Sequence, residues 1–231
     1  MKIIPVLDLM NGLVVHARRG RRADYRPLQS PLCKASEPRA LIEGLLDLHP
    51  FRTLYAADLD ALTGRGRQTV ALEHLGRAFP ELELWVDQGF PDRGERPSFP
   101  PWGRIVPVIG SESLDDQRLL SMAQLPRDFI LSLDFRNGVL VGPTDLLERP
   151  DLWPERIILM SLSRVGSGDG PDFVRAERFV RRHPKHRFIA AGGVRNERDL
   201  ERLEALGMAA VLVASALHSG TIDSGVLNRF G

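Results

Sequence analysis

One pattern occurs twice in this chain, and the repetition limits the fold more than any other feature of the sequence. The first copy reads VLDLMNGLVV over residues 6–15, and the second reads SLDFRNGVLV over residues 132–141. In both copies an apolar run ends in an aspartate, Asp8 or Asp134, and an Asn-Gly turn and a second apolar run follow. Apolar runs bounded by turn signals are typical of buried strands. We therefore predict two related halves, each with an aspartate where a buried strand emerges into a loop.

These two aspartates are the first candidates for catalysis. A carboxylate at the end of a strand is exposed enough to be ionised and anchored enough to be aimed, and two of them suggest an acid–base pair. The alternative is that each aspartate only accepts hydrogen bonds from loop amides, as Asp often does near turns. The repetition favours the catalytic interpretation.

Short apolar segments predict eight strands, and most connections between them have helical spacing. The strands are expected at residues 2–8, 52–57, 82–86, 104–109, 129–133, 157–160, 188–191 and 210–213. Helices are expected at residues 37–48, 67–79, 114–122, 172–182, 197–206 and 224–230. The segment 91–102 is rich in proline and glycine and is predicted to be a poor helix.

This alternation predicts a parallel sheet with both faces buried. Eight units in 231 residues fit an α/β fold of one domain over residues 1–231, the closed (β/α)8 or TIM barrel, built from two similar half-barrels. The rival is a doubly wound open sheet, which normally uses fewer strands, and no GxGxxG turn follows the first strand. In a closed barrel the first and fifth strands lie opposite each other, so Asp8 and Asp134 are expected to face each other across the cavity.

The two halves also match at later strand ends, where Asp58 corresponds to Ser161, Gly89 to Gly193, and Ser111 to Ser215. These three pairs lie at nearly the same separation along the chain. The separation of Asp8 and Asp134 is larger, because the loop after the first strand is longer than its counterpart.

The composition is ordinary for a soluble globular protein, with 43% hydrophobic and 26% charged residues. A net charge of +1 does not suggest nucleic acid as a partner. No apolar run is long enough to cross a bilayer, and the N-terminus leads directly into a strand, so we expect no signal peptide and no membrane partner. The single cysteine, Cys33, allows no internal disulfide and no thiolate metal cluster. These features predict a cytoplasmic protein and leave its oligomeric state open.

Strand ends near the C-terminus predict a phosphate site. Barrels often bind phosphate at this corner with backbone amides and a short helix N-terminus, and glycine lets the backbone approach the oxygens closely. The predicted phosphate-binding residues are Gly166, Gly192, Gly193, Ala214 and Ser215. The alternative is that the glycines serve only as turns.

Charged residues around the predicted mouth complete the candidate site. Arginines crowd the loop after the first strand, which is either a solvated loop or a lid that grips an anion. A glycine-rich loop at 164–170 is a second, weaker candidate for closing over an anion. The predicted substrate-binding residues are Arg18, Arg19, Arg21, Arg22, Asp58, Asp87 and Arg164. His183 and His186 have the spacing of a metal pair but flank Pro184 at a helix end, so we predict no metal site.

Several of these segments together resemble the phosphoribosylformimino-aminoimidazole-carboxamide ribotide isomerase of histidine biosynthesis and its cyclase sister. The resemblance covers nearly the whole chain and is strongest at residues 4–8 (IPVLD), 57–60 (ADLD), 133–134 (LD), 191–194 (AGGV) and 213–217 (VASAL). It implies a duplicated half-barrel with two phosphate corners, with Asp8 as base and Asp134 as acid. The reaction that it implies is an Amadori rearrangement of an aminoaldose phosphate into an aminoketose, without metal or cofactor.

The sequence departs from the family pattern in four places. The first phosphate corner, usually a glycine cluster, reads DQG at 87–89, and Glu112 adds an acid that would repel phosphate. Met160 stands where a catalytic threonine is expected, which leaves the neighbouring Ser161 as the third catalytic candidate. His16 stands where an arginine is usual. The segment 16–28 looks more like an isomerase-related subgroup found near genes for the one-carbon carrier cofactors methanopterin and methanofuran.

We therefore predict an isomerase-like barrel that binds a small phosphorylated, sugar-like metabolite and performs aldose–ketose proton transfer. One-carbon carrier cofactor synthesis is a candidate pathway, and no cofactor is expected. Two alternatives stay open. One is the histidine-pathway isomerase itself, and the other is a non-catalytic protein that binds a phosphometabolite through the phosphate corner alone.

Overall fold

Eight parallel strands close into a barrel in this computed structural model, which describes residues 1–90, 103–125 and 127–230. The strands are β1 (Lys2–Met10), β4 (Thr53–Asp58), β5 (Glu83–Asp87), β6 (Arg104–Gly110), β7 (Ile130–Arg136), β9 (Arg156–Ser161), β10 (Arg187–Ala191) and β11 (Ala210–Val213). Each strand pairs with the next in this order, and β11 pairs with β1, so the sheet has no open edge along this ring. The predicted (β/α)8 barrel is therefore confirmed, and the open-sheet alternative is wrong.

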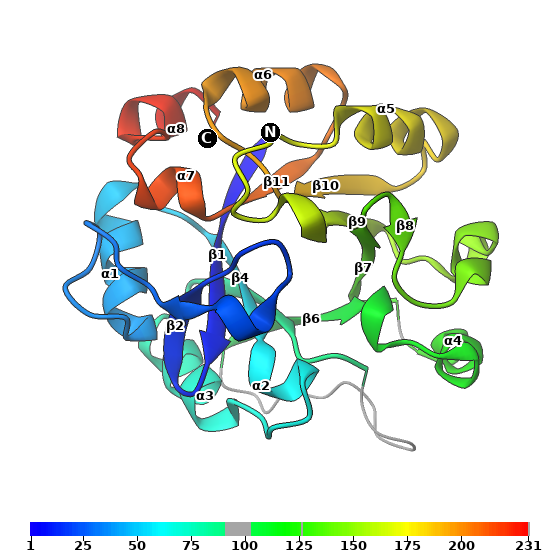
Figure 1. Cartoon of the computed structure of the whole chain (residues 1–231), viewed down its shortest axis with the longest axis horizontal. Coiled ribbons are helices and arrows are strands. Elements are labelled where there is room, and N and C mark those ends of the chain that lie inside the picture. Colours follow the sequence, from blue (N-terminus) through cyan, green and yellow to red (C-terminus); the bar gives the residue numbers. More distant parts are fainter. Residues whose placement is uncertain (91–102, 126, 231) are drawn as a thin grey trace.

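Helices surround the ring of strands (Figure 1). The longer ones are α1 (Pro38–Leu48), α3 (Thr69–Ala78), α4 (Asp116–Met122), α5 (Phe173–Arg182), α6 (Glu197–Ala205) and α8 (Ser224–Phe230). All six agree with the predicted helices to within a few residues. The predicted poor helix at 91–102 lies outside the described residues. Between β7 and β9 the chain forms the short 3-10 helices η3 (Thr144–Glu148) and η4 (Pro150–Leu152), because three prolines interrupt this segment.

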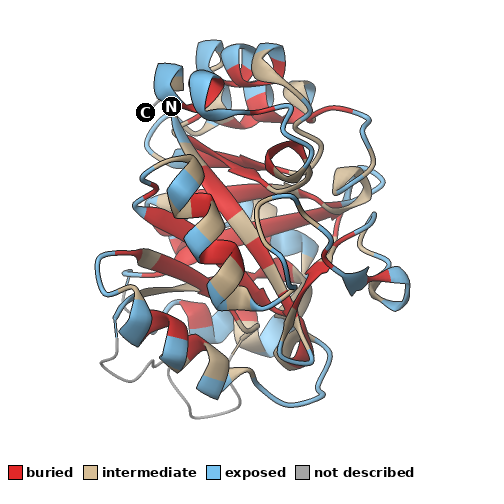
Figure 2. Cartoon of the chain, turned by 90° about the vertical axis from the view of Figure 1, so that its left-hand side faces the viewer, coloured by how far each residue is buried: buried red, intermediate tan, exposed pale blue. Residues whose placement is uncertain are grey.

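Alternate residues of each strand contribute to two separate apolar cores. Ile4, Trp85, Ile130 and Ile158 belong to the core inside the barrel. The residues between them on the strands, such as Leu159, pack with the inward faces of the helices. Figure 2 shows the result, since most of the length of the barrel strands is buried, while the helices are buried on one face and exposed on the other. This alternation follows from the two-residue repeat of a strand.

The repeated sequence pattern forms the same hairpin in both halves. β1 continues past Asp8 and returns through Asn11 and Gly12 as β2 (Leu13–His16). The turn residues have φ of 52° and 77°, the left-handed pair that a tight hairpin needs. β7 likewise returns as β8 (Val139–Leu140). The predicted Asn-Gly turns are confirmed, whereas the prediction that the first strand ends at Asp8 was wrong by two residues.

The two halves also correspond around the rest of the mouth. β1 and β7 lie four positions apart in the ring of eight, on opposite sides of the barrel. A short helical turn follows β4 as α2 (Leu59–Leu62) and follows β9 as η5 (Leu162–Arg164). Another follows β6 as η2 (Ser111–Ser113) and follows β11 as α7 (Ser215–His218). The fold therefore has two similar half-barrels, as the sequence pattern predicted.

Candidate active site

A cavity of about 320 Å³ opens at the carboxyl ends of the barrel strands. Strand ends, the turns that follow them and the loop after β2 line it, and this is the face where barrel enzymes hold their reacting groups. Four carboxylates line the cavity, namely Asp8, Asp87, Glu112 and Asp134. The charge of this group is countered by Arg22, which also lines the cavity.

Asp134 is the most firmly held of these carboxylates. Its Oδ1 accepts a hydrogen bond from the Ser132 hydroxyl at 2.6 Å, and its Oδ2 accepts one from the Glu112 amide at 3.1 Å. Only 3% of the residue is exposed. Burial, together with the charges of Glu112 and Asp87, raises the pKa of Asp134 to about 8, although the Ser132 hydrogen bond lowers it in part. Asp134 is therefore buried at the end of its strand, whereas the sequence pattern suggested a carboxylate exposed enough to be ionised.

Asp8 has a different environment on the opposite strand. Its carboxylate forms no hydrogen bond or ion pair within the described residues. Burial raises its pKa to about 7, while the nearby Arg22 guanidinium lowers it and Asp87 raises it. Of the two aspartates in the repeat, Asp8 thus has the lower pKa and the freer side chain.

Asp87 lies beside Asp134 at the end of β5. Its Oδ2 accepts a hydrogen bond from the Tyr55 hydroxyl at 3.1 Å, and its Oδ1 accepts one from the Gly89 amide at 3.0 Å. Burial raises the pKa of Asp87 to about 6. Gly110 separates the two acids, since a Cβ there would lie 2.9 Å from the Asp134 Oδ2 and 3.4 Å from the Asp87 Oδ2. A larger residue at Gly110 would push the acids apart.

Tyr55 is a cavity residue that sequence reasoning missed. Its ring is buried inside the barrel and its hydroxyl reaches the acids at the mouth. Burial raises the pKa of Tyr55 well above its ordinary range, and the charges of Asp87, Asp134 and Asp8 add to this. The available signal was a tyrosine on the inward-facing register of a predicted strand, three residues before Asp58.

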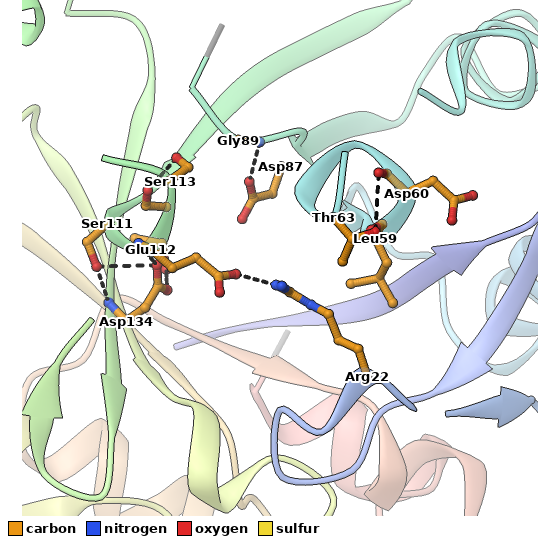
Figure 3. Close-up of polar contacts among 12 residues, drawn as sticks. Arg22, Leu59, Asp60, Thr63, Asp87, Gly89, Ser111, Glu112, Ser113 and Asp134 are labelled. Atoms are coloured by element: carbon orange, nitrogen blue, oxygen red, sulfur yellow. Dashed lines mark hydrogen bonds and ion pairs between the residues drawn. The ribbon is translucent and has the colours of Figure 1, made fainter. Parts of the chain in front are cut away.

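Glu112 and Arg22 form an ion pair across the mouth, from η2 to the loop between β2 and β3 (Arg26–Pro27) (Figure 3). Their side chains are 17% and 26% exposed. The other predicted arginines point elsewhere and do not line the cavity. Arg19 faces Asp169 at 3.6 Å and Arg21 faces Asp24 at 3.2 Å, while Arg18 is exposed.

All five predicted phosphate-binding residues line the cavity on the side away from Glu112, namely Gly166, Gly192, Gly193, Ala214 and Ser215. Gly192 and Gly193 have φ of 95° and 92°, and a Cβ on Gly193 would lie 2.4 Å from the Gly170 carbonyl oxygen. The amides of Gly193 and Ser215 donate to no acceptor in the described ranges. Several unsatisfied donors therefore meet at one corner of the cavity, which suits an anion.

Two histidines border this corner. The Ser215 hydroxyl lies 3.4 Å from His16 Nε2, and the Ser30 hydroxyl lies 3.0 Å from His218 Nδ1. Burial and, to a smaller extent, His16 lower the pKa of His218 to about 4. Burial also lowers the pKa of His16. His218 was missed from the sequence because its distance from the other predicted residues along the chain gave no signal beyond its place shortly after Ser215.

Asp58, Ser161 and Arg164 also lie outside the cavity lining. Asp58 is fully buried and caps α2, accepting from the amides of Ala61 at 3.0 Å and Gln68 at 2.7 Å. The Ser161 hydroxyl accepts from Arg175 at 3.3 Å on the helix side of the barrel. Arg164 donates to the Gly170 carbonyl at 2.8 Å and so holds the glycine-rich loop.

Met160, by contrast, lines the cavity. Neighbouring strand residues point to opposite faces, so the inward position at the end of β9 belongs to Met160 and the outward one to Ser161. The negative charges that raise the pKa of Asp134 are those of Glu112 and Asp87.

Neither a cluster of side chains able to hold a metal ion nor a helix able to span a membrane occurs among the residues that the structure describes. Among them no group of three or more His, Cys, Asp or Glu side chains is arranged to hold a metal ion. No helix among them is both long enough and apolar enough to span a membrane. His183 and His186 pack around Trp153, and His186 Nδ1 lies 2.9 Å from the Pro154 carbonyl.

Comparison with known proteins places this barrel in a family. The sequence model described as "Histidine biosynthesis protein" matches residues 2–223. The chain belongs to this family. Members of the family are therefore the proper reference for the cavity described above.

Three relatives show how wide the family is. An uncharacterized protein of Methanocaldococcus jannaschii is 30% identical over the full length of both chains. Two relatives are named 1-(5-phosphoribosyl)-5-((5-phosphoribosylamino)methylideneamino)imidazole-4-carboxamide isomerase. The one from Methylococcus capsulatus is 26% identical over 96% of each chain. The one from Thermococcus kodakarensis is 27% identical over 96% of this chain and 94% of its own.

Proposed function

We propose that this protein is an aldose–ketose isomerase that carries out an Amadori-type proton transfer on a phosphorylated, sugar-like metabolite. The observation that carries the proposal is the pair Asp8 and Asp134, which come from opposite strands and line one cavity. Their pKa values are raised to about 7 and about 8. An acid–base pair works near neutral pH when the acid has the higher pKa and the base the lower one.

Asp134 acts first, as the acid. Because its pKa is about 8, it is mostly protonated at neutral pH and donates its proton to the ring oxygen of the sugar. The bond between that oxygen and the carbon bearing nitrogen breaks, the nitrogen lone pair forms a C=N bond, and the ring opens. The hydrogen bonds from Ser132 and the Glu112 amide fix the carboxylate in place and stabilise the charge that appears on it.

Asp8 then acts as the base. It has no hydrogen-bond partner among the described residues, so its oxygens are free to meet the substrate. It removes the proton from the carbon next to the C=N bond, which gives an enol. The enol loses its hydroxyl proton and the carbon beside nitrogen gains one, so the aminoketose forms and the two aspartates return to their starting protonation. Tyr55 and Asp87 line the cavity between the two acids and hold sugar hydroxyls.

The second half of the proposal is that the substrate carries a phosphate. It is supported by the part of the cavity that we call the glycine corner, which is lined by Gly166, Gly192, Gly193, Ala214 and Ser215. Gly193 and Ser215 both line the cavity, and their amides have no acceptor in the described ranges. A phosphate bound there would fix one end of the substrate, and a fixed end holds the reacting carbons between the two aspartates.

The test replaces each aspartate by its neutral isostere. The substrate is first identified by metabolite profiling of a deletion strain. We then expect Asp8→Asn and Asp134→Asn each to lower turnover by ~10²–10⁴, the usual contribution of a general acid or base. Binding of inorganic phosphate, measured by calorimetry, should be unchanged, because the glycine corner is untouched.

Glu148→Gln, on an exposed position of η3, is the control and should keep full turnover. Near-normal turnover in either aspartate variant would remove that residue from the mechanism. A protein that binds phosphate in all three forms and turns over no metabolite would support the non-catalytic alternative.

The histidine-pathway isomerase is the second candidate, and family membership favours it. The relatives of that name act on a compound with two phosphoribosyl groups. Glu112, at the corner opposite the glycines, speaks against a second phosphate in this chain. Complementation of a histidine auxotroph that lacks the isomerase separates the two candidates. None of the three relatives described above is named for one-carbon cofactor synthesis, so that pathway stays a prediction for metabolite profiling.

A further inference from the structure

The two halves of the mouth have the same backbone plan but differ in one corner. In the second half, the phosphate corner is formed by the ends of β10 and β11 and by α7. Its counterpart in the first half is formed by the ends of β5 and β6 and by η2. The duplicated fold would allow this second corner to hold an anion in the same way, so its actual side chains decide what it binds.

Three backbone amides of this counterpart corner are already occupied. The Gly89 amide donates to the Asp87 carboxylate at 3.0 Å, and the Phe90 amide donates to the Ser113 hydroxyl at 2.9 Å. The Glu112 amide donates to Asp134 at 3.1 Å. The chain's own side chains thus take the donors that would otherwise meet a phosphate. In the glycine corner the Gly193 amide, which is the counterpart of the Gly89 amide, has no acceptor in the described ranges, and neither has the Ser215 amide.

The charge of this corner is negative as well. The Glu112 carboxylate lines the cavity close to Asp87 and Asp134, and its charge raises the pKa of both. Its counter-ion is Arg22, which reaches it from the loop between β2 and β3 (Figure 3). An incoming phosphate that captured Arg22 would leave Glu112 largely buried and unpaired, which is costly.

We infer that the substrate carries a single phosphate, held at the glycine corner, and that its other end bears an amine or ammonium that donates hydrogen bonds to Glu112. Glu112 is then the residue that sets specificity, accepting a donor group and rejecting a second phosphate. This inference rests on the proposed function, because it describes the substrate of the same cavity.

A set of simple probes tests it without knowledge of the natural substrate. The probes are linear alkyl monophosphates whose far end is a hydroxyl or an ammonium, and the matching alkyl bisphosphate, each in several chain lengths. Their affinities are measured by calorimetry on the full chain. At the best chain length we expect the ammonium probe to bind at least ~10-fold more tightly than the bisphosphate, since opposite charge at a partly desolvated site favours binding and like charge opposes it.

The variant Glu112→Gln should remove most of this preference and leave the affinity of the hydroxyl probe within ~2-fold, because the phosphate corner is unchanged. Glu148→Gln again serves as the control and should retain the preference of the natural chain. The affinities of the ammonium and bisphosphate probes for the natural chain already test the inference. The test therefore does not depend on the stability of the Glu112 variant.

The outcomes separate this inference from the proposed function. A bisphosphate that binds as tightly as the ammonium probe, or a preference that survives in Glu112→Gln, would overturn the inference and leave the isomerase proposal standing. If no alkyl phosphate binds at any length, the glycine corner is not a phosphate site. In that case the proposed phosphorylated substrate is wrong and the inference falls with it.

Discussion

The buried carboxyl group of Asp8 lowers the stability of the folded protein at neutral pH. Burial raises its pKa from the ordinary 3.8 to about 7, so the folded state holds the proton more tightly than the unfolded chain does. Between about pH 4 and pH 7, Asp8 is therefore mostly ionised in the unfolded chain but still mostly protonated in the folded protein. Raising the pH through this window consequently lowers the free energy of unfolding of the natural protein.

The variant Asp8→Asn removes this pH dependence. We expect it to match the natural protein near pH 4 and to be more stable by up to ~4 kcal/mol at pH 8, given about 1.4 kcal/mol per pKa unit and a pKa raised from 3.8 to about 7. Calorimetric unfolding across this range measures it. Asp145→Asn, at an exposed position, should give no such pH-dependent gain. A difference that stays flat from pH 4 to pH 8 would show that Asp8 is not held in its neutral form.

At the scale of elements, glycines do two distinct jobs in turns that look alike in sequence. Gly12 lies in the turn between β1 and β2, where it has φ of 77°, and a Cβ added to it would meet no other atom within 4 Å. Gly193 has φ of 92°, and a Cβ there would lie 2.4 Å from the Gly170 carbonyl oxygen. The first glycine serves only the backbone conformation, whereas the second also allows two loops to pack closely at the glycine corner.

Alanine substitution should separate these jobs. Gly12→Ala is expected to cost ~1 kcal/mol of stability through backbone strain alone, with phosphate affinity unchanged. Gly193→Ala should cost at least ~2 kcal/mol and weaken phosphate binding by ~10-fold or more, because the clash displaces the loop. Denaturant unfolding and calorimetry give the two quantities. Equal effects of the two variants on phosphate affinity would mean that Gly193 does not shape the corner.

At the scale of the whole molecule, the mouth of the barrel is electrically uneven although its backbone is repeated. Four carboxylates and Arg22 occupy one side, and unsatisfied amides with His16 and His218 occupy the other. Burial lowers the pKa of His218 to about 4 and also lowers that of His16. Both imidazoles are therefore mostly neutral at neutral pH, and a bound anion would favour their charged forms.

Anion binding should accordingly take up protons. Sulfate is the suitable probe, because it does not itself titrate near neutral pH. We expect a net uptake on the order of half a proton per sulfate at about pH 6, falling toward zero near pH 8, from calorimetry in buffers of different ionisation enthalpy. His218→Gln should reduce this uptake, and His183→Gln, at the end of α5 and outside the cavity lining, should not. Zero uptake at pH 6 would place the anion away from the histidines.

The sequence by itself determined the elements whose causes are local. Asn-Gly pairs between apolar runs specified both hairpins, and the alternation of strands and helices specified the barrel. Two strands that lie opposite in a closed ring also placed Asp8 and Asp134 on opposite sides of the mouth. The glycine corner followed from its position at the last two strands, a place that every such barrel shares.

Only the tertiary structure decided which polar side chains enter the cavity. Arg22 turns inward because it pairs with Glu112, which lies 90 residues away along the chain. No local pattern in the sequence distinguishes Arg22 from Arg19 or Arg21. A shift of one residue sends Ser161 to the helix side and Met160 to the cavity. The Asp58 carboxylate caps α2 by accepting a hydrogen bond from the Ala61 amide, and it does not enter the cavity. The direction of a side chain and the pKa of a carboxyl depend on neighbours brought together by folding, and those neighbours are distant along the chain.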